Sequence, residues 1–201
     1  MAVGYQNTII ILLDGGKYIM ENKFVLFVIG EDRPGIVAAV SGVLYKNNFN
    51  IEDSSMTILE RYFAMILIIS SKERYNIPLL MKKFKEVEKK LNLYISVKRI
   101  APVREKGEMF INAEPYIITL IGSDRIGIVH KITNLIAESN INITDVKTEI
   151  IGEEKTPIYT MILELEIPPE INIKKFRTSL FQLGKELNVK ITLKPIDILK
   201  L

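Results

Sequence analysis

The amino-acid sequence contains two copies of one pattern, about half a chain apart. Residues 30–37, Gly-Glu-Asp-Arg-Pro-Gly-Ile-Val, match residues 122–129, Gly-Ser-Asp-Arg-Ile-Gly-Ile-Val, at an offset of 92. The match continues from residues 48–53 to residues 140–145, and later in each copy the offset becomes 96, which indicates a four-residue insertion in a turn. A chain of 201 residues with two such copies is a tandem of two similar domains and not a long repeat array.

Hydrophobic periodicity predicts the same order of elements in both copies. A short apolar run ended by Gly30 is typical of a buried central strand, and helical spacing of apolar residues follows from Ile36. The strands expected in the first copy are 24–29, 51–59, 62–71 and 94–100, with helices from 36 and across 77–91. This β-α-β-β-α-β order predicts an α+β protein of two ferredoxin-like units, each a four-stranded antiparallel sheet with two helices on one face.

The repeat also predicts the domain boundaries. We expect an N-terminal extension at 1–22, a first domain at 23–101, a linker at 102–114 and a second domain at 115–201. Residues 1–19 are either an upstream extension or a spare edge strand. Each unit has about 75 residues, a size at which a single core is marginal, so we expect the two sheets to pack against something, most simply each other.

The composition excludes several classes of chemistry. The chain has no Cys and one His, which rules out disulfides, Cys-ligated metals and a thiol nucleophile, and leaves too few ligands for a His-rich metal site. The sequence has neither the Gly-Lys-Ser/Thr phosphate loop nor the Gly-x-Gly-x-x-Gly dinucleotide motif. We therefore expect a non-enzymatic protein of the reducing cytoplasm, without metal or cofactor.

The longest apolar run near the N-terminus is too short to cross a membrane. Residues 9–13, Ile-Ile-Ile-Leu-Leu, are followed at once by Asp14-Gly-Gly-Lys, whereas a helical span needs about 20 apolar residues. We therefore expect no membrane association.

The repeated loop lies where a strand gives way to a helix, which is a position suited to anions. Glycines let the backbone turn tightly, and the following helix offers unpaired N–H groups and the positive end of its dipole to a carboxylate. Asp32 and Asp124 could receive an ammonium group, so a free amino acid would satisfy both charges. The alternative is structural: the Asp caps the helix, Pro34 takes the first helical position and Gly35 permits close packing.

The strand, the Gly-x-Asp-Arg-Pro-Gly-Ile-Val loop, the helix and the Asn-x-Asn-Ile opening of the next strand resemble the ACT domain, over residues 23 to 198. A tandem of this kind without a catalytic domain resembles free-standing two-ACT regulatory proteins. The resemblance implies amino-acid binding at the interface of paired ACT units. In the first copy it points to Asp32, Arg33, Pro34, Gly35, Ile36, Val37, Asn50 and Ile51. In the second copy it points to Asp124, Arg125, Gly127, Ile128, Val129, Asn142 and Ile143.

The second copy departs from the family pattern at one position, where Ile126 replaces proline, so its loop is expected to be less preorganised. The resemblance further implies a homo-oligomer, such as a dimer, in which the ligand stabilises one pairing or oligomeric state over another. A role in amino-acid metabolism or transcription through a protein partner is the corresponding expectation.

A rival interpretation rests on the basic segment 72–106, which carries eleven Lys or Arg and four Glu, a net charge of +7 in a chain of net charge +3. The segment could make the protein an interaction adaptor that binds nucleic acid or a protein partner. The alternative is a solvated helix face, because the apolar positions between the lysines suit a core. Without a helix-turn-helix motif or a stacking platform of aromatics, direct nucleic-acid binding is not expected. His130 is expected to be a partly exposed surface residue.

Overall fold

The structure is a computed structural model that describes residues 9–12, 18–100, 112–152 and 157–196. The chain divides into two compact units, residues 1–103 (unit 1) and 104–201 (unit 2), and each is described by itself. Of the predicted linker, residues 102–111 lie outside the described residues, as do residues 153–156 of the turn to which the four-residue insertion was assigned.

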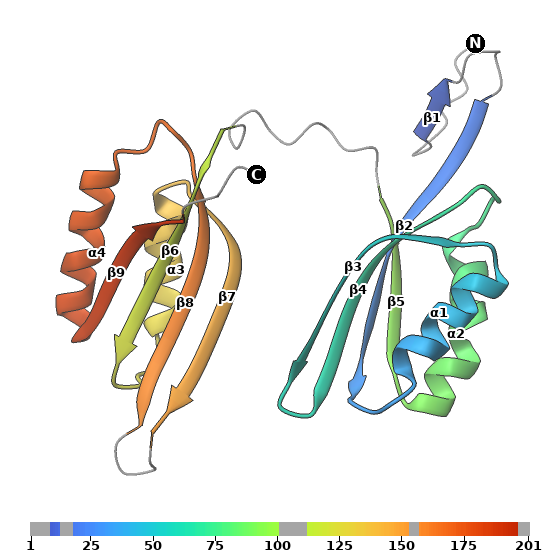
Figure 1. The fold of residues 1–201 in the computed structure, drawn as a ribbon, viewed down its shortest axis with the longest axis horizontal. Coiled ribbons are helices and arrows are strands. Elements are labelled where there is room, and N and C mark those ends of the chain that lie inside the picture. The colour runs from blue at the N-terminus through green and yellow to red at the C-terminus, as the bar shows by residue number, and fades with distance from the viewer. Residues whose placement is uncertain (1–8, 13–17, 101–111, 153–156, 197–201) are drawn as a thin grey trace. The chain divides into compact units, whose positions relative to one another are not determined.

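Unit 1 is an antiparallel sheet covered on one face by two helices (Figure 1). Its four central strands run in the spatial order β5-β2-β4-β3, with β3 and β5 at the two edges. The elements are β1 (Ile9–Leu12), β2 (Tyr18–Glu31), α1 (Ile36–Lys46), β3 (Asn50–Leu59), β4 (Tyr62–Ser71), α2 (Ile77–Leu91) and β5 (Tyr94–Arg99).

The first long strand begins earlier than its apolar run predicts. Strand β2 extends back to Tyr18, where residues 18–21 pair with β1 as an antiparallel hairpin. Of residues 1–19, residues 9–12 form a strand that, within the described part of the chain, pairs only with this extension of β2. The extension was missed because the apolar run on which the strand was predicted begins only at Phe24, within the part of β2 that pairs with β4 and β5.

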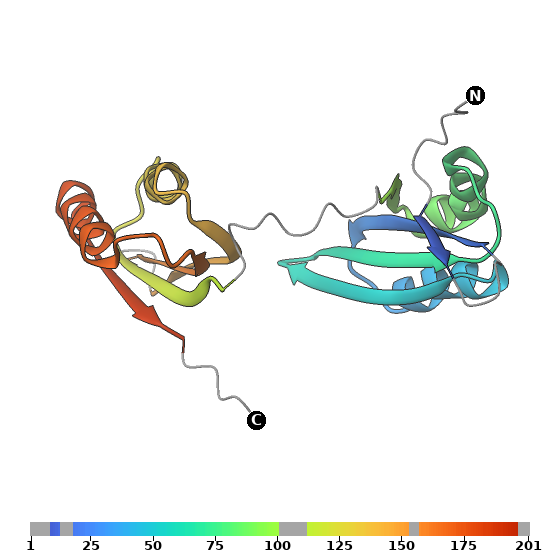
Figure 2. The same ribbon diagram turned by 90° about the horizontal axis from the view of Figure 1, so that it is seen from above.

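Unit 2 repeats the architecture of unit 1 without the extra strand. Its strands run in the order β7-β8-β6-β9, all antiparallel, which is the same topology as β3-β4-β2-β5. The elements are β6 (Glu114–Gly122), α3 (Ile128–Glu138), β7 (Asn142–Ile151), β8 (Ile158–Ile167), α4 (Ile173–Leu187) and β9 (Val189–Pro195). The predicted α+β fold with two βαββαβ units is thus confirmed, and Figure 2 shows both helices of unit 2 on one side of its sheet.

Each unit has its own hydrophobic core between sheet and helices. In unit 1, alternate residues of β2, such as Phe24, Leu26 and Val28, are buried beneath Val40 of α1 and Phe84 of α2. Unit 2 has a separate cluster with equivalent residues. In each unit, the alternating apolar residues of the strands and the helically spaced apolar residues of the helices are therefore buried in one core.

Several repeated residues satisfy backbone requirements. Asn48 and Asn140 follow helices with φ of 55° and 58°, and Asn92 and Asn188 end α2 and α4 in the left-handed conformation. Asparagine tolerates this region better than most residues. A β-bulge follows Ile51 in β3, and another occupies the same place in β7. These parts of the repeat are explained by the fold alone.

Candidate functional site: the two loop-helix junctions

Both repeated loops adopt the same backbone conformation where they enter the first helix of their unit. Gly35 is the N-cap residue of α1 with φ 98° and ψ −8°, and Gly127 is the N-cap of α3 with φ 95° and ψ −6°. Glycine is favoured there because other residues rarely adopt a positive φ. Ile126 is fully exposed and leaves the glycine geometry unchanged, so proline is not needed for this conformation.

The structural alternative for the repeated aspartates is wrong. No side chain caps α1 or α3, and Pro34 lies in the turn before Gly35, outside the helix. The physical reason is that glycine occupies the N-cap position itself, which places Asp32 and Asp124 three residues upstream of it. Both aspartates are exposed beside the helix start.

The first turn of each helix consequently presents N–H groups that no side chain caps. Ile36 is buried and fixes the helix on the sheet, whereas Val37 and its counterpart Val129 are each close to half exposed. Unpaired N–H groups and the positive end of the helix dipole attract a carboxylate. In α3 the N–H of Ile128 lies 3.4 Å from the carbonyl oxygen of Arg125, which leaves the N–H of Val129 more available. Binding of a carboxylate at these helix starts stays a prediction.

Arg33 has a structural partner away from the first turn. Its guanidinium donates a hydrogen bond to the carbonyl of Leu91, at the C-terminal end of α2, where the helix dipole favours a cation. In unit 2 a different pair links the two helices, Lys131 of α3 with Glu186 of α4. Arg33 therefore ties the loop to α2, and its role in ligand binding stays a prediction.

Asn50 and Ile51 do not lie beside the loop of their own unit. Because α1 runs back along the sheet, β3 begins at the far end, where Asn50 is opposite Ser70 in the register, while the loop follows Glu31 at the near end. Asn142 and Ile143 are placed in the same way in unit 2. Within one unit, the two parts of the predicted residue set are therefore at opposite ends of the sheet.

A groove runs along α1 towards these residues. It has a volume of about 510 Å³ and reaches from Ala38, one turn into the helix, to Asn50 and Ile51 at the start of β3. Its helix wall has the small residues Ala38, Ser41 and Gly42 at the loop end and the larger Leu44 and Tyr45 at the other end. The loop end and the strand start of one unit are thus the two ends of one surface beside the β3 edge.

A polar cavity at the start of β3 was missed by the sequence analysis. It has a volume of about 490 Å³ and is lined by polar and charged residues only: Asn48, Asn50, Glu52, Ser70, Ser71, Lys72 and Glu73. The signal was a departure from the repeat, since Pro168 and Pro169 replace Lys72 and Glu73 in the second copy. Unit 2 keeps Asn48 and Asn50 as Asn140 and Asn142 but replaces the other five lining residues.

An ion pair beside this cavity makes unit 1 sensitive to acid. The Nζ of Lys23 lies 2.6 Å from the Oε2 of Glu52, and the hydrogen bond from Lys23, followed by one from Ser70, lowers the pKa of Glu52 below its ordinary value. A lowered folded-state pKa contributes stability that is present above the unfolded-state value and is lost as pH falls through the folded one. Below about pH 4.5 we expect unit 1 to lose stability.

The acid sensitivity is measured by urea unfolding of the full chain between pH 3 and 7. In Glu52→Gln the pH-dependent loss in unit 1 should shrink by about 1 kcal/mol or less, because both groups are partly exposed. Glu149→Gln in unit 2 is the control and should leave the unit 1 profile unchanged. An unchanged profile in Glu52→Gln would contradict the assignment.

The glycine at the start of α1 can be tested separately from packing. A Cβ built on Gly35 would have no neighbour within 4 Å, so Gly35→Ala adds only backbone strain. We expect a loss of about 1 kcal/mol in the free energy of unfolding of unit 1. Gly42→Ala, at an equally open position inside α1, is the control and should stabilise instead, by about 0.5–1 kcal/mol. Equal effects of the two substitutions in denaturant unfolding would be inconsistent with the positive φ.

The basic helix α2 exposes its charges and buries its apolar residues. Leu80 and Phe84 are buried in the core, while Lys82, Lys83 and Lys85 are exposed. This is the pattern of a solvated helix face. His130 is exposed on α3, as expected.

Metal-binding clusters and membrane-spanning helices are both absent from the described residues. No group of three or more His, Asp or Glu side chains there is placed to hold a metal ion. Nor does that part of the chain contain a helix with the length and hydropathy needed to span a membrane.

Comparison with known proteins identifies the family. The ACT domain model matches the chain twice, over residues 22–98 and 114–194. The chain belongs to the ACT domain family. A UPF0237 protein of Streptococcus pneumoniae serotype 4 is 37% identical over 79 residues, which is 39% of this chain and 90% of that protein. A UPF0237 protein of Methanocaldococcus jannaschii is 39% identical over 77 residues, or 38% of this chain and 86% of that one.

Solved structures match the whole tandem. A protein of unknown function from Galdieria sulphuraria aligns over 88% of this chain and 99% of its own, with a TM-score of 0.71 and 27% identity. A structure named "putative glycine cleavage system transcriptional repressor" aligns over 89% of this ACT protein and 99% of its own chain, with a TM-score of 0.64 and 19% identity. The two ACT domains of this chain belong to a family whose members typically bind small ligands.

Proposed function

We propose that this tandem ACT protein is a non-enzymatic regulator that binds a free amino acid at an interface between paired ACT units. The observation that carries the proposal is the pair of glycine-capped helix starts, Gly35 and Gly127, whose N–H groups no side chain caps. The carboxylate of the ligand binds these groups at residues 36–37 or 128–129. Its ammonium group lies near Asp32 or Asp124, or near the Asn50 region of a paired unit.

The need for two units follows from the topology. The loop and the start of β3 lie at opposite ends of one sheet, and β3 is an edge strand. If two such edges pair antiparallel, the start of one β3 approaches the loop end of the other unit. Asn50 of one unit and Val37 of another then face the same ligand, which accounts for both parts of the predicted residue set.

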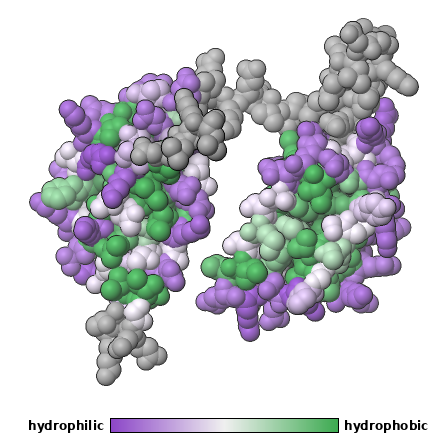
Figure 3. Space-filling model, viewed as in Figure 1, coloured by the Kyte–Doolittle hydropathy of each residue, from purple (hydrophilic) through white to green (hydrophobic). Residues whose placement is uncertain are grey.

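Exposed apolar residues support pairing. On the face of the unit 1 sheet away from the helices, Ile29, Tyr62 and Ile66 are each about half exposed. Met56 and Ile58 of β3 are similarly exposed, but they lie opposite the core residues Met65 and Phe63 and so belong to the other face. Figure 3 shows hydrophobic surface on the visible face of this unit. Contiguous apolar surface of this kind marks interaction sites.

The proposed output is a change in domain pairing or oligomeric state. A ligand shifts such an equilibrium only through its different affinity for the two states, which a ligand bound between units provides. A homo-oligomer such as a dimer, a cytoplasmic location and control of amino-acid metabolism or transcription through a protein partner belong to this proposal. The role in transcription is supported only by the shared fold with the structure named as a putative repressor.

The proposal is tested by a thermal-shift screen of the full chain against the twenty amino acids, followed by calorimetry. At least one amino acid should raise the melting temperature, and light scattering should show a change in mass or shape with the same ligand. If none of the twenty stabilises the protein, the proposal is wrong. Duplex DNA in a salt series serves as the comparison for the basic-adaptor interpretation.

A further inference from the structure

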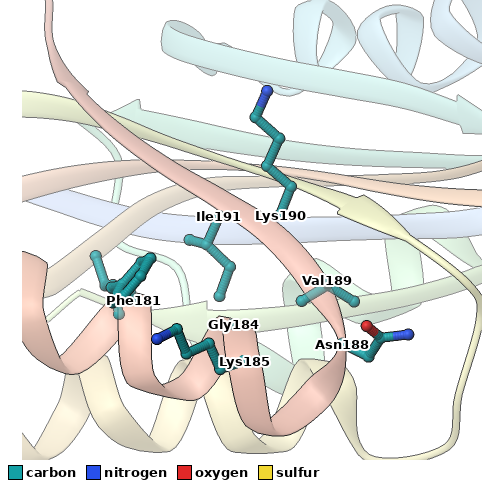
Figure 4. A pocket seen from close by; sticks show the side chains of 8 residues that line it. Phe181, Gly184, Lys185, Asn188, Val189, Lys190 and Ile191 are labelled. Atoms are coloured by element: carbon teal, nitrogen blue, oxygen red, sulfur yellow. The ribbon is translucent and has the colours of Figure 1, made fainter.

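A second groove lies in unit 2, between α4 and the edge strand β9, far along the chain from the repeated loops. This α4–β9 groove has a volume of about 550 Å³ and is lined by Leu180, Phe181, Gly184, Lys185, Asn188, Val189, Lys190 and Ile191. Figure 4 shows Phe181 and Lys185 projecting from α4 beside Ile191, while Lys190 points away from them. An apolar wall with a few polar groups is the usual lining of a small-molecule site.

The same place in unit 1 is filled by a carboxylate. There, Glu88 of α2 reaches the edge strand β5, and its Oε1 accepts the N–H of Ile95 at 3.1 Å. The residues that correspond to Glu88 and Ile95 at an offset of 96 are Gly184 and Ile191. Gly184 has no side chain, so unit 2 lacks the acceptor that unit 1 provides.

The N–H of Ile191 points to the outer edge of its sheet. Ile191 is opposite Leu120 in the register, which is the position that Ile95 has opposite Val28. Alternate residues of an edge strand direct their backbone groups outward. Two residues further along β9, the carbonyl of Leu193 also points outward, and it accepts a hydrogen bond of 2.6 Å from Arg177 of α4.

The charge of the groove favours an anion without a cationic group. Its lining includes Lys185 and Lys190 and no Asp or Glu. The Nζ of Lys185 lies 4.5 Å from the ring centroid of Phe181, so charge and apolar surface are adjacent. An ammonium group would find no carboxylate partner among these residues.

We propose that the α4–β9 groove binds a small carboxylate that has an apolar body and no ammonium group. Its carboxylate takes the place that Glu88 fills in unit 1, where it accepts the N–H of Ile191 and pairs with Lys185. Its apolar body lies on Phe181 and Leu180. The site is separate from the loops in residues and in ligand charge, so it stands or falls independently of the proposed amino-acid binding.

The experiment is a titration of the ¹⁵N-labelled full chain with 4-methylpentanoate, followed by amide chemical shifts. We expect a saturable shift at Ile191 and Gly184 with none at Ile95. Leucine, which adds an ammonium group, and 4-methylpentanol, which lacks the charge, should not reproduce the shift at Ile191. Binding at the loops would instead move Val37 and Val129, so the two proposals have different signatures.

Variants with matched controls complete the test. Lys185→Glu should weaken binding of 4-methylpentanoate about tenfold or more, since a charge-assisted contact is lost, whereas Lys89→Glu at the equivalent position of α2 should have no effect. Gly184→Glu should abolish binding by restoring the internal carboxylate. A Cβ there would lie 3.0 Å from the carbonyl of Val189, so correct folding of this variant is checked first by its spectrum.

Any one of three results would overturn the proposal. These are no saturable shift at Ile191 in the wild-type chain, an equal shift with 4-methylpentanol or leucine, and undiminished binding in Lys185→Glu. A Gly184→Glu chain that does not fold leaves the Lys185→Glu comparison with Lys89→Glu to decide.

Discussion

Phe84→Ala should strongly destabilise unit 1 and leave the stability of unit 2 unchanged. The Phe84 side chain is fully buried between α2 and the sheet, in a cluster that contains no residue of unit 2. Removing such a side chain costs about 3–5 kcal/mol through lost burial and the cavity left behind. A domain of this size has a total stability of about 4–12 kcal/mol, so the loss is a large part of it.

The measurement is the ¹H–¹⁵N spectrum of the full chain combined with urea unfolding. Amides of the unit 1 core, such as Leu26, should lose dispersion at lower urea, while Ile118 in unit 2 keeps its wild-type shift. Lys85→Ala, at the next and exposed position, is the control and should change stability by less than about 0.5 kcal/mol. Joint unfolding of both units in Phe84→Ala would mean that they do not have independent cores.

The second large effect on stability is expected at Gly122, which packs closely against Val189 at the start of β9. A Cβ on Gly122 would lie 2.6 Å from the Cγ1 of Val189, 3.0 Å from its Cβ and 3.1 Å from its Cα. Valine cannot turn all three atoms away, because its branched side chain is stiff. Gly122→Ala should therefore destabilise unit 2 by about 2–3 kcal/mol.

Gly30→Ala is the matched substitution in unit 1 and should cost less. There the nearest atom, at 2.4 Å, is the Cδ2 of Leu93, the end of a flexible side chain, and the nearest backbone atom is the carbonyl oxygen of Asn92 at 3.3 Å. Rotation of the leucine relieves the contact, for about 1 kcal/mol. The difference is read from thermal unfolding of each unit. A larger loss for Gly30→Ala than for Gly122→Ala would contradict the packing described for Val189.

The fold was predictable because two signals agreed. Strand alternation and helical spacing both indicated the core that Leu26, Val40 and Phe84 form, and the repeat gave the same order twice. The strand near the N-terminus was predicted only as one of two interpretations of residues 1–19. Asp14-Gly15-Gly16 between two apolar runs is a turn signal that could have favoured it.

The candidate site was less predictable because a repeat preserves backbone geometry as well as function. Asn48 is repeated for its positive φ, and Asn50 lies at the end of the sheet away from the loop, which only the direction of β3 reveals. The polar cavity and the α4–β9 groove occur where the copies differ, as at Glu88 and Gly184. Differences between the copies were therefore the more informative signal for new sites.

The central claim is that backbone N–H groups at the loop-helix junctions hold the carboxylate of an amino acid. Val37→Pro removes one such N–H at the second position of α1, which is the position that Pro78 already occupies in α2. Proline is tolerated in a first helical turn because its missing N–H has no partner in the helix. Val129→Pro makes the equivalent change in α3, and Val37→Ala and Val129→Ala retain the N–H as controls.

The deciding measurement is calorimetric titration of these variants with the amino acid that stabilises the wild-type chain. We predict that the proline variants lose binding about tenfold or more at the altered loop, while the alanine variants bind with nearly wild-type affinity. Wild-type binding by a correctly folded chain that carries both Val37→Pro and Val129→Pro would contradict the claim.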